Sequence, residues 1–221
     1  MRCVNRGDPP QDKGGQPLQF NRYQEATPHL KQRLGRYCSF CERWIAANLA
    51  IEHKHPQSAA GHLTLTWSNF LLACSNCNSA KGAKTSDDTN VLWPDVDNTF
   101  GALTYQPTGR IQPNESASMD QHRRAKNLLT LVGLDRGPGE GPSDHRWFDR
   151  LEVWRLAQQS AEDIAETATA QMIARVVDTA AACGGFSIWM HVFAHLPQVR
   201  EALVSRFPGT AFREQPLPGN T

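Results

Sequence analysis

The sequence lacks the strong charge imbalance and the long apolar runs that assign many proteins to a class at once. Its 221 residues carry 23 Lys and Arg against 22 Asp and Glu, so the formal net charge is only +1. Any site for a polyanion therefore has to be a local patch. No run of residues approaches the length that spans a bilayer, and the stretch MRCVNRGDPPQDKGG contains no apolar signal core. We expect a soluble protein of the cytoplasm that is not bound to membranes.

Internal repeats are also missing, and the chain divides instead by residue composition and hydrophobic pattern. Its length allows one larger domain, or one domain of ordinary size with a smaller partner. Gly, Pro, Gln and charged residues in 1–20 predict an extended arm, and Leu30 and Leu34 before Gly35 predict a short helix. We therefore expect an arm and helix over 1–35. A core with its following loops is expected over 36–117, of which 84–117 is mostly loop.

The pattern turns helical at Ser118. Ser118 and Gln121 fit a capping box, and an apolar stripe then runs as far as Gly133. Further helices are predicted over about 144–159, 161–182, 186–195 and 198–207. The basic cluster at 122–126 is expected to be a solvated helix face. The helical region is thus predicted over 118–210, and a flexible tail over 211–221.

Four of the six cysteines form two C-x2-C pairs, Cys38 with Cys41 and Cys74 with Cys77. Two such pairs present four thiolates to one tetrahedral ion, which suits a structural Zn2+ site. Two disulfides are disfavoured by the compartment, and a thioredoxin-like motif is disfavoured because the pair occurs twice. The interval of roughly thirty residues between the pairs exceeds that of a zinc ribbon, so the loop has room for a second site.

That loop contains IEHKHP, residues 51–56, with one carboxylate, two imidazoles and one ammonium. Residues 47–56 are typical of a short strand that runs into a turn, and residues 67–82 of a loop and a helical segment returning to the cysteines. The zinc would therefore bring Glu52, His53 and an asparagine together. Such a set suits metal-assisted phosphodiester hydrolysis, in which an imidazole deprotonates water and an ion on oxygen ligands polarises the phosphate.

The order C-x2-C, Glu-His followed by Pro, Trp-x-Asn, and C-x2-C-Asn-x-x-Lys resembles the HNH endonuclease family, which has a ββα-metal core. The stretches MRCVNRGDPP, RYCSFCE, LWPDVDN and AKNLLTLVGLDR are more closely similar to HNH subunits of Septu-type and retron-associated anti-phage defence systems. The resemblance implies an α+β fold. Its parts would be a small zinc-stabilised ββα-metal core, an N-terminal arm and a mainly α-helical C-terminal region.

The resemblance also implies a role for each residue of the motif. His53 would be the general base, and Glu52 and Asn78 would hold a catalytic Mg2+ or Mn2+ ion. Asn69 would orient the loop that carries the base. The family often has Asp where this chain has Glu52, so the longer side chain is a departure from its pattern.

Two further residues are candidate substrate contacts. Lys81 matches the lysine of the motif and would meet phosphate. His55 has no fixed role in the family pattern, but residues alternate along a strand, so His55 could share a face with His53 and contact substrate or metal. Trp44 and Trp67 are expected to pack in the core around the zinc rather than to stack on bases.

Two functions fit these residues. The first is an HNH endonuclease that cuts DNA in preference to RNA, as the effector subunit of an anti-phage defence system. Because phosphate neutralisation supplies most non-specific affinity, the weak net charge favours a partner. By resemblance, this is an ATPase of ABC or SMC-like type docked on the helical region, with a retron as a further candidate partner. The alternative is a non-catalytic zinc module that binds nucleic acid or protein. The intact set Glu52, His53, Asn69 and Asn78 favours the nuclease.

Overall fold

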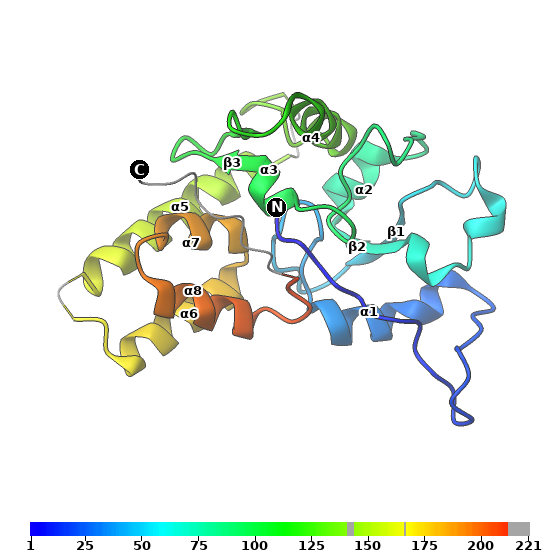
Figure 1. Cartoon of the computed structure of the whole chain (residues 1–221), viewed down its shortest axis with the longest axis horizontal. Helices are drawn as coiled ribbons and strands as arrows, with labels where there is room; N and C mark the ends of the chain where they lie inside the picture. Colours follow the sequence, from blue (N-terminus) through cyan, green and yellow to red (C-terminus); the bar gives the residue numbers. More distant parts are fainter. Residues whose placement is uncertain (141–143, 166, 212–221) are drawn as a thin grey trace.

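The computed structural model describes residues 1–140, 144–165 and 167–211 of the chain. Figure 1 shows α5–α8 grouped on one side and α1, β1 and β2 on the other, with the N-terminal segment starting between them. The fold is α+β, as the sequence predicts, with two small antiparallel sheets and a helical C-terminal region. None of the described helices is long and apolar enough to cross a membrane.

The zinc loop forms a ββα unit. Its elements are β1 (Ala50–His53), β2 (Phe70–Ala73) and α2 (Ser75–Lys81). The strands pair antiparallel with Glu52 opposite Leu71 and His53 opposite Phe70. Strand β2 was expected to be loop, because its four apolar residues do not alternate with polar ones. They do not alternate because both faces of this strand are buried.

The segment before this unit forms η1 (Tyr23–Ala26) and α1 (Thr27–Leu34). Gly35 ends α1 with a φ of 75°, which confirms the predicted helix end. Residues 1–4 are extended but buried, and Val4 bridges to Thr210 near the other end of the described chain. Arg6 donates hydrogen bonds to the carbonyls of Phe70 (2.9 Å) and Ser68 (2.7 Å). Residues 1–6 are therefore an extended segment that packs within the fold, and we call them the N-terminal strap.

Residues 84–117 contain more regular structure than the expected loops. They form α3 (Thr99–Ala102), β3 (Leu103–Tyr105) and β4 (Ile111–Pro113). Earlier in the chain, two short 3-10 turns, η2 (Gly61–Leu63) and η3 (Trp67–Asn69), precede β2. Strands β3 and β4 form the second antiparallel pair. The remaining loop is fixed by side chains of the next helix.

That helix is α4 (Met119–Val132), and it begins with the predicted capping box of Ser118 and Gln121. Gly133 ends it at a φ of 64°. The basic cluster is not simply solvated, because Arg123 donates to Asn90 at 2.6 Å and Arg124 donates to Asp97 at 3.0 Å. These bonds pin the segment before α3 to α4.

The C-terminal region consists of α5 (Arg146–Asp163), α6 (Ala170–Cys183), α7 (Phe186–Val192) and α8 (Pro197–Arg206). The helix predicted over 161–182 begins later than expected. Helix α5 continues to Asp163, and Thr169 begins α6 by accepting a hydrogen bond from the Met172 amide. The predicted tail lies outside the described residues, apart from Ala211.

One hydrophobic core joins these regions, and Glu42 lies at their junction. The buried carboxylate of Glu42 accepts hydrogen bonds from the Arg2 amide (2.5 Å), the Ser187 amide (2.7 Å) and the Ser187 hydroxyl (2.6 Å). The Gly185 amide donates to the Glu42 carbonyl at 3.0 Å. The turn after Cys41 is therefore tied to both the N-terminal strap and the start of α7.

Candidate active site

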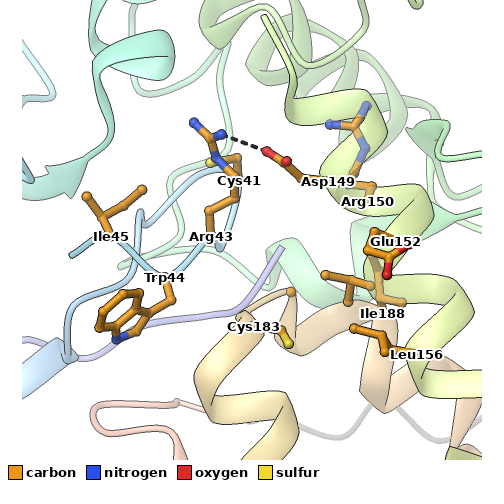
Figure 2. Close-up of a pocket in the computed structure, with 12 residues that line it drawn as sticks. Cys41, Arg43, Trp44, Ile45, Asp149, Arg150, Glu152, Leu156, Cys183 and Ile188 are labelled. Carbon is orange, nitrogen blue, oxygen red and sulfur yellow. Dashed lines mark hydrogen bonds and ion pairs between the residues drawn. The ribbon is translucent and has the colours of Figure 1, made fainter. Parts of the chain in front are cut away.

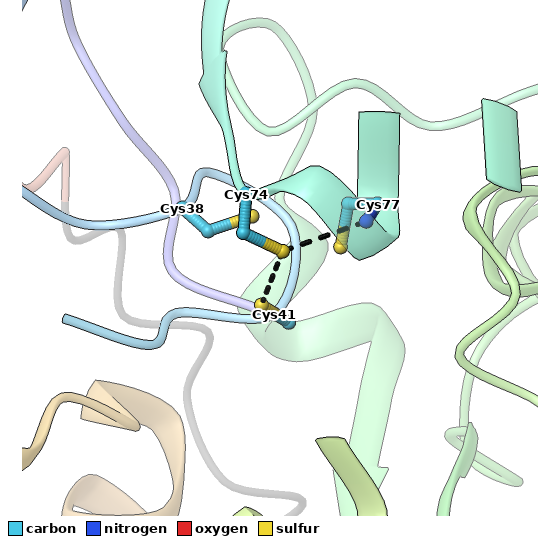
Figure 3. A group of neighbouring side chains, drawn as sticks. All are labelled: Cys38, Cys41, Cys74 and Cys77. Carbon is cyan, nitrogen blue, oxygen red and sulfur yellow. Dashed lines mark hydrogen bonds between the residues drawn. The ribbon is translucent and has the colours of Figure 1, made fainter. Parts of the chain in front are cut away.

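The four paired cysteines converge on one point (Figure 3). All are buried, and their sulfurs lie within 4.8 Å of one another. The sulfurs of Cys41 and Cys74 are 3.6 Å apart. Sulfurs at the corners of a tetrahedral zinc site are about 3.8 Å apart, because each lies about 2.3 Å from the ion. The geometry and the donor chemistry of Cys38, Cys41, Cys74 and Cys77 therefore fit Zn2+.

Cationic side chains surround this cluster. The Arg146 Nη1 donates to the Cys77 sulfur at 3.1 Å and to the Val132 carbonyl at 2.8 Å. Burial lowers the pKa of Arg43, but the charge of Cys41 and a hydrogen bond to Cys74 outweigh it and raise that pKa overall. Four thiolates around one Zn2+ carry a net charge of −2. The two guanidinium groups balance that charge.

The residues that the sequence singles out next to the zinc line one cleft of about 300 Å³. Strand β1 supplies Glu52 and His53, and helix α2 supplies Asn78. The cleft is also lined by Tyr23 and Gln57. The ββα unit thus presents a carboxylate, an imidazole and an amide to the same space.

His53 is oriented by its neighbours in a way that leaves one nitrogen for proton transfer. Its Nε2 lies 3.0 Å from the Thr64 carbonyl oxygen, which can only accept, so Nε2 carries the proton in the neutral ring. Nδ1 then holds the lone pair, with the Gln57 amide nitrogen 3.5 Å away. The rings of Tyr23 and Phe70 contact the imidazole at centroid distances of 4.8 and 5.3 Å. These two edge contacts restrict the orientation of the ring.

The pKa of His53 is lowered. Burial is the main cause, and the charge of Lys81 acts in the same direction, while the hydrogen bond to Thr64 opposes them. A histidine with a lowered pKa is neutral at pH 7, which is the form that accepts a proton.

Glu52 is held by Lys81 inside the unit. Its Oε1 lies 2.9 Å from the Lys81 ammonium, and the two side chains are 4% and 0% exposed. Burial raises the pKa of Glu52, and the charge of Lys81 opposes that rise. The other oxygen, Oε2, is buried and has no hydrogen-bond partner among the described residues. Since the Lys81 ammonium does not reach the surface, this arrangement does not fit a direct contact with substrate phosphate.

The unpaired Oε2 of Glu52 and the Asn78 side chain in the same cleft are oxygen donors of the kind that Mg2+ and Mn2+ prefer. Within the described residues, the four cysteines are the only group that brings three or more Cys, His, Asp or Glu ligands together. A divalent ion on Glu52 and Asn78 would therefore take its other ligands from water and substrate, as Mg2+ commonly does.

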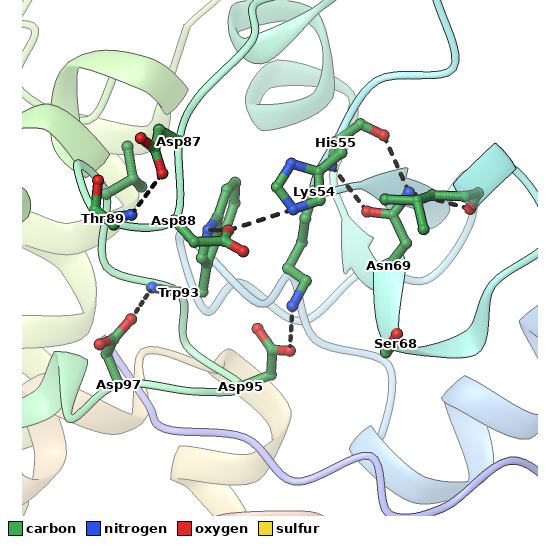
Figure 4. Close-up of polar contacts among 12 residues, drawn as sticks. Lys54, His55, Ser68, Asn69, Asp87, Asp88, Thr89, Trp93, Asp95 and Asp97 are labelled. Carbon is green, nitrogen blue, oxygen red and sulfur yellow. Dashed lines mark hydrogen bonds and ion pairs between the residues drawn. The ribbon is translucent and has the colours of Figure 1, made fainter. Parts of the chain in front are cut away.

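Asn69 ties down the chain that follows the base (Figure 4). Its side chain is 2% exposed; it accepts from the His55 amide at 2.8 Å and donates to the carbonyls of His55 (3.0 Å) and Leu63 (3.2 Å). These bonds hold the turn between β1 and the segment that carries Thr64. The position suits the expected role of orienting the loop beside the base.

His55 does not share the cleft with His53. Strand β1 ends at His53, so the alternation that would place both rings on one face stops there. The His55 ring points to the 88–97 segment, where its Nε2 lies 3.3 Å from an Asp88 oxygen and its centroid 6.3 Å from that of Trp93. Figure 4 shows this pair turned away from Asn69.

The tryptophans also differ from expectation. Trp67 is buried, but its Nε1 donates to the Gly7 carbonyl at 2.8 Å and its ring packs near Phe20, so it anchors the N-terminal segment. Trp44 is 41% exposed and lies within 5.5 Å of the Arg36 guanidinium carbon. The expectation that both pack in the core is therefore wrong for Trp44, whose ring lies at the surface beside Arg36 and lines a surface cavity.

A second cavity, of about 320 Å³, lies between this turn and the C-terminal helices (Figure 2). It is lined by Trp44, by Leu156 of α5 and by Ile188 of α7, and an ion pair of 2.6 Å between Arg43 and Asp149 crosses it. None of the residues that line the first cleft lines this cavity.

Sequence reasoning missed Tyr23, Gln57 and Arg146. Gln57 was within reach, because it follows the histidine by four residues at the end of IEHKHPQ. Tyr23 and Arg146 carry no local signal. They reach the cleft and the cysteines only because distant segments fold against the ββα unit.

Residues 36–84 match the family model for HNH endonuclease. The matched region contains both cysteine pairs, β1, β2 and α2, and excludes Tyr23 and all of the C-terminal helices. A search of curated proteins finds no match to the chain. The domain supports a nuclease function, with a nucleic-acid substrate and a dependence on metal.

Proposed function

Because residues 36–84 form an HNH endonuclease domain, we propose that the chain is a metal-dependent endonuclease that hydrolyses phosphodiester bonds, with DNA favoured over RNA. The observation that carries the proposal is the convergence of Glu52, His53 and Asn78 on one cleft. In this proposal the zinc on the four cysteines is structural.

His53 acts as the general base. Its Nε2 donates to the Thr64 carbonyl, so Nδ1 takes the proton from the attacking water. The Gln57 amide, whose hydrogen bond to Nδ1 is long at 3.5 Å, gives up that nitrogen to the water, and the Tyr23 ring packs against the imidazole. Asn69 holds the turn on which this geometry depends.

Glu52 and Asn78 hold the catalytic divalent ion, either Mg2+ or Mn2+. When bound, the ion polarises the phosphate and stabilises the charge on the leaving oxygen. Glu52 of β1 and Asn78 of α2 would hold the ion beside His53, so that substrate bound to it lies next to the base. The zinc site fixes α2 against β1 through Cys74 and Cys77.

The proposed biological setting is an anti-phage defence system in which this chain is the nuclease effector. The supports are the similarity of its motifs to Septu-type and retron-associated HNH subunits and the net charge of only +1. In this proposal, residues 1–35 support the core, residues 36–117 cut, and the helical region 118–210 docks an ATPase of ABC or SMC-like type. An ATPase encoded by an adjacent gene should co-purify with the chain; the lack of any such gene would contradict this part.

The test of the nuclease is a cleavage assay on plasmid DNA and tRNA across a Mg2+ and Mn2+ titration, with EDTA as the blank. Glu52→Ala and Asn78→Ala should each need more metal for the same rate, because each removes an oxygen ligand from a hard cation. If EDTA and both substitutions leave cleavage unchanged, or if no condition gives cleavage, the chain is a non-catalytic zinc module instead.

A further inference from the structure

Lys81 is fully buried, with 0% of its side chain exposed. Lysine is almost never fully buried unless its charge is paired, because taking an ammonium group out of water is costly. Among the described residues, the acidic group within ion-pair distance of the Lys81 ammonium is Glu52, at 2.9 Å. The buried Lys81 ammonium therefore pairs with Glu52, a carboxylate that lines the cleft.

The helix that carries Lys81 also carries the second proposed ligand. Asn78 and Lys81 are three residues apart in α2, so both lie on the face of the helix that packs on β1. Gly82 ends α2 directly afterwards with a φ of 51°, a conformation that favours glycine. Helix α2 thus carries the ammonium and the amide on the same face, next to the strand that carries Glu52.

We propose that Lys81 is a positioning residue: its ammonium holds Glu52 by Oε1 and leaves Oε2 free to bind the divalent ion. The inference rests on the proposed function and deepens it. Oε1 is engaged by Lys81, and Oε2 is buried without a partner among the described residues. A carboxylate anchored through one oxygen keeps a single side-chain conformation, so the other oxygen is pre-organised in the cleft that Asn78 also lines.

The pair also balances charge in the buried site. Without Lys81, both oxygens of Glu52 would be unpaired inside the protein, which costs more than turning the side chain toward water. The carboxylate would then leave the position in which Lys81 holds it. Residues that orient a metal ligand in this way typically account for 10- to 100-fold in metal affinity.

The experiment measures Mn2+ binding to the full-length, zinc-loaded chain by the electron paramagnetic resonance signal of free Mn2+. Lys81→Met should weaken binding by about tenfold or more. Lys84→Met is the matched control, since Lys84 lies three residues further on and its ammonium contacts only the Ala80 carbonyl among the described residues. We expect Mn2+ affinity in Lys84→Met to equal that of the wild type.

A double-variant comparison separates positioning from a general effect. Glu52→Gln should weaken Mn2+ binding by itself, and adding Lys81→Met to it should cause no further loss. Lys81→Gln provides a second neutral side chain, and zinc content and circular dichroism report folding for each variant. Equal or tighter Mn2+ binding by a folded Met or Gln variant would overturn the proposal. Loss of zinc and helix in both would also overturn it, by assigning Lys81 to folding.

The outcomes distinguish the two proposals. If the wild type neither binds Mn2+ nor cuts nucleic acid, the proposed nuclease fails. If it does both while Lys81→Met binds Mn2+ like the wild type, only the positioning role fails.

Discussion

At the scale of single residues, His53 owes its proposed reactivity to its surroundings. The Thr64 carbonyl selects the tautomer, burial disfavours the imidazolium, and two aromatic rings restrict the orientation of the ring. His55, two residues away, lies outside the cleft, where its ring pairs with Asp88 and lies near Trp93. The two histidines of one short motif are therefore expected to differ sharply in importance.

Replacing His53 by Ala should lower the cleavage rate by about 10^2- to 10^4-fold, because a general base contributes about that much. Zinc content and the unfolding midpoint should change little, because the His53 side chain contacts none of the four zinc-binding cysteines in the described structure. His55→Ala is the control, and its rate should stay within a few-fold of the wild type. A His53→Ala protein that cuts as fast as the wild type would remove the base from the mechanism.

The pH dependence follows from the lowered pKa of His53. A base must be unprotonated, so activity is present above its pKa in the folded protein and is lost as the pH falls through that value. Burial places this acid limb below the ordinary histidine pKa of about 6.5. The measurement is kcat/KM against pH at saturating metal. A midpoint on the alkaline side of 6.5 would be incompatible with this assignment.

At the scale of elements, the turn after Cys41 connects parts of the fold that are distant in sequence. The Glu42 carboxylate receives three hydrogen bonds of 2.7 Å or less from Arg2 and Ser187, and the Tyr105 hydroxyl lies 3.3 Å away. Its buried position leaves no water to replace a lost partner. The zinc turn, the strap and α7 therefore depend on one side chain.

Glu42→Gln should lower the free energy of unfolding by about 2 kcal/mol, because hydrogen bonds to a buried charged group are worth about 1.5–3 kcal/mol each and an amide replaces only some of them. Urea unfolding of the zinc-loaded protein measures the change. The exposed Glu115→Gln makes the same chemical change and should alter the unfolding free energy by less than about 0.5 kcal/mol. Equal effects at both positions would contradict the role given to Glu42.

At the scale of the whole molecule, the cysteine cluster lies where the turn at 38–43, the ββα unit and α5 meet. Cys77 contacts Arg146 of α5, while the Cys38 amide hydrogen-bonds to the Arg43 carbonyl at 3.0 Å. The small β1–β2 sheet has only two strands, which is marginal by itself. Metal binding is therefore expected to supply much of the folding free energy of this region.

Elemental analysis of the purified protein should find about one Zn2+ per chain, since four thiolates complete one tetrahedral site. Cys74→Ser should leave the ββα unit unfolded, as loss of near-ultraviolet circular dichroism and protease resistance would report. Cys183→Ser is the control, because this thiol lies outside the cluster. A well-folded wild-type protein without bound metal would contradict the zinc assignment.

The sequence by itself determined the features that depend on short spacing. The two cysteine pairs, the Glu52-His53 step and the helix ends at Gly35 and Gly133 follow from local geometry and ligand chemistry, and the α+β class follows from the resemblance that these motifs carry. Each can be recognised without knowing what packs against it. The zinc cluster and much of the candidate cleft were predictable for this reason.

Only the tertiary structure decided the surroundings of these residues. Lys81 faces inward to Glu52, Trp44 faces outward, and Tyr23 covers His53 from a segment outside the HNH match. A spacing fixes which residues can share a turn or a helix face, but not which distant segment buries that face. Burial then sets the charge pairing and the pKa values, so the electrostatics of the cleft emerge only with the packed fold.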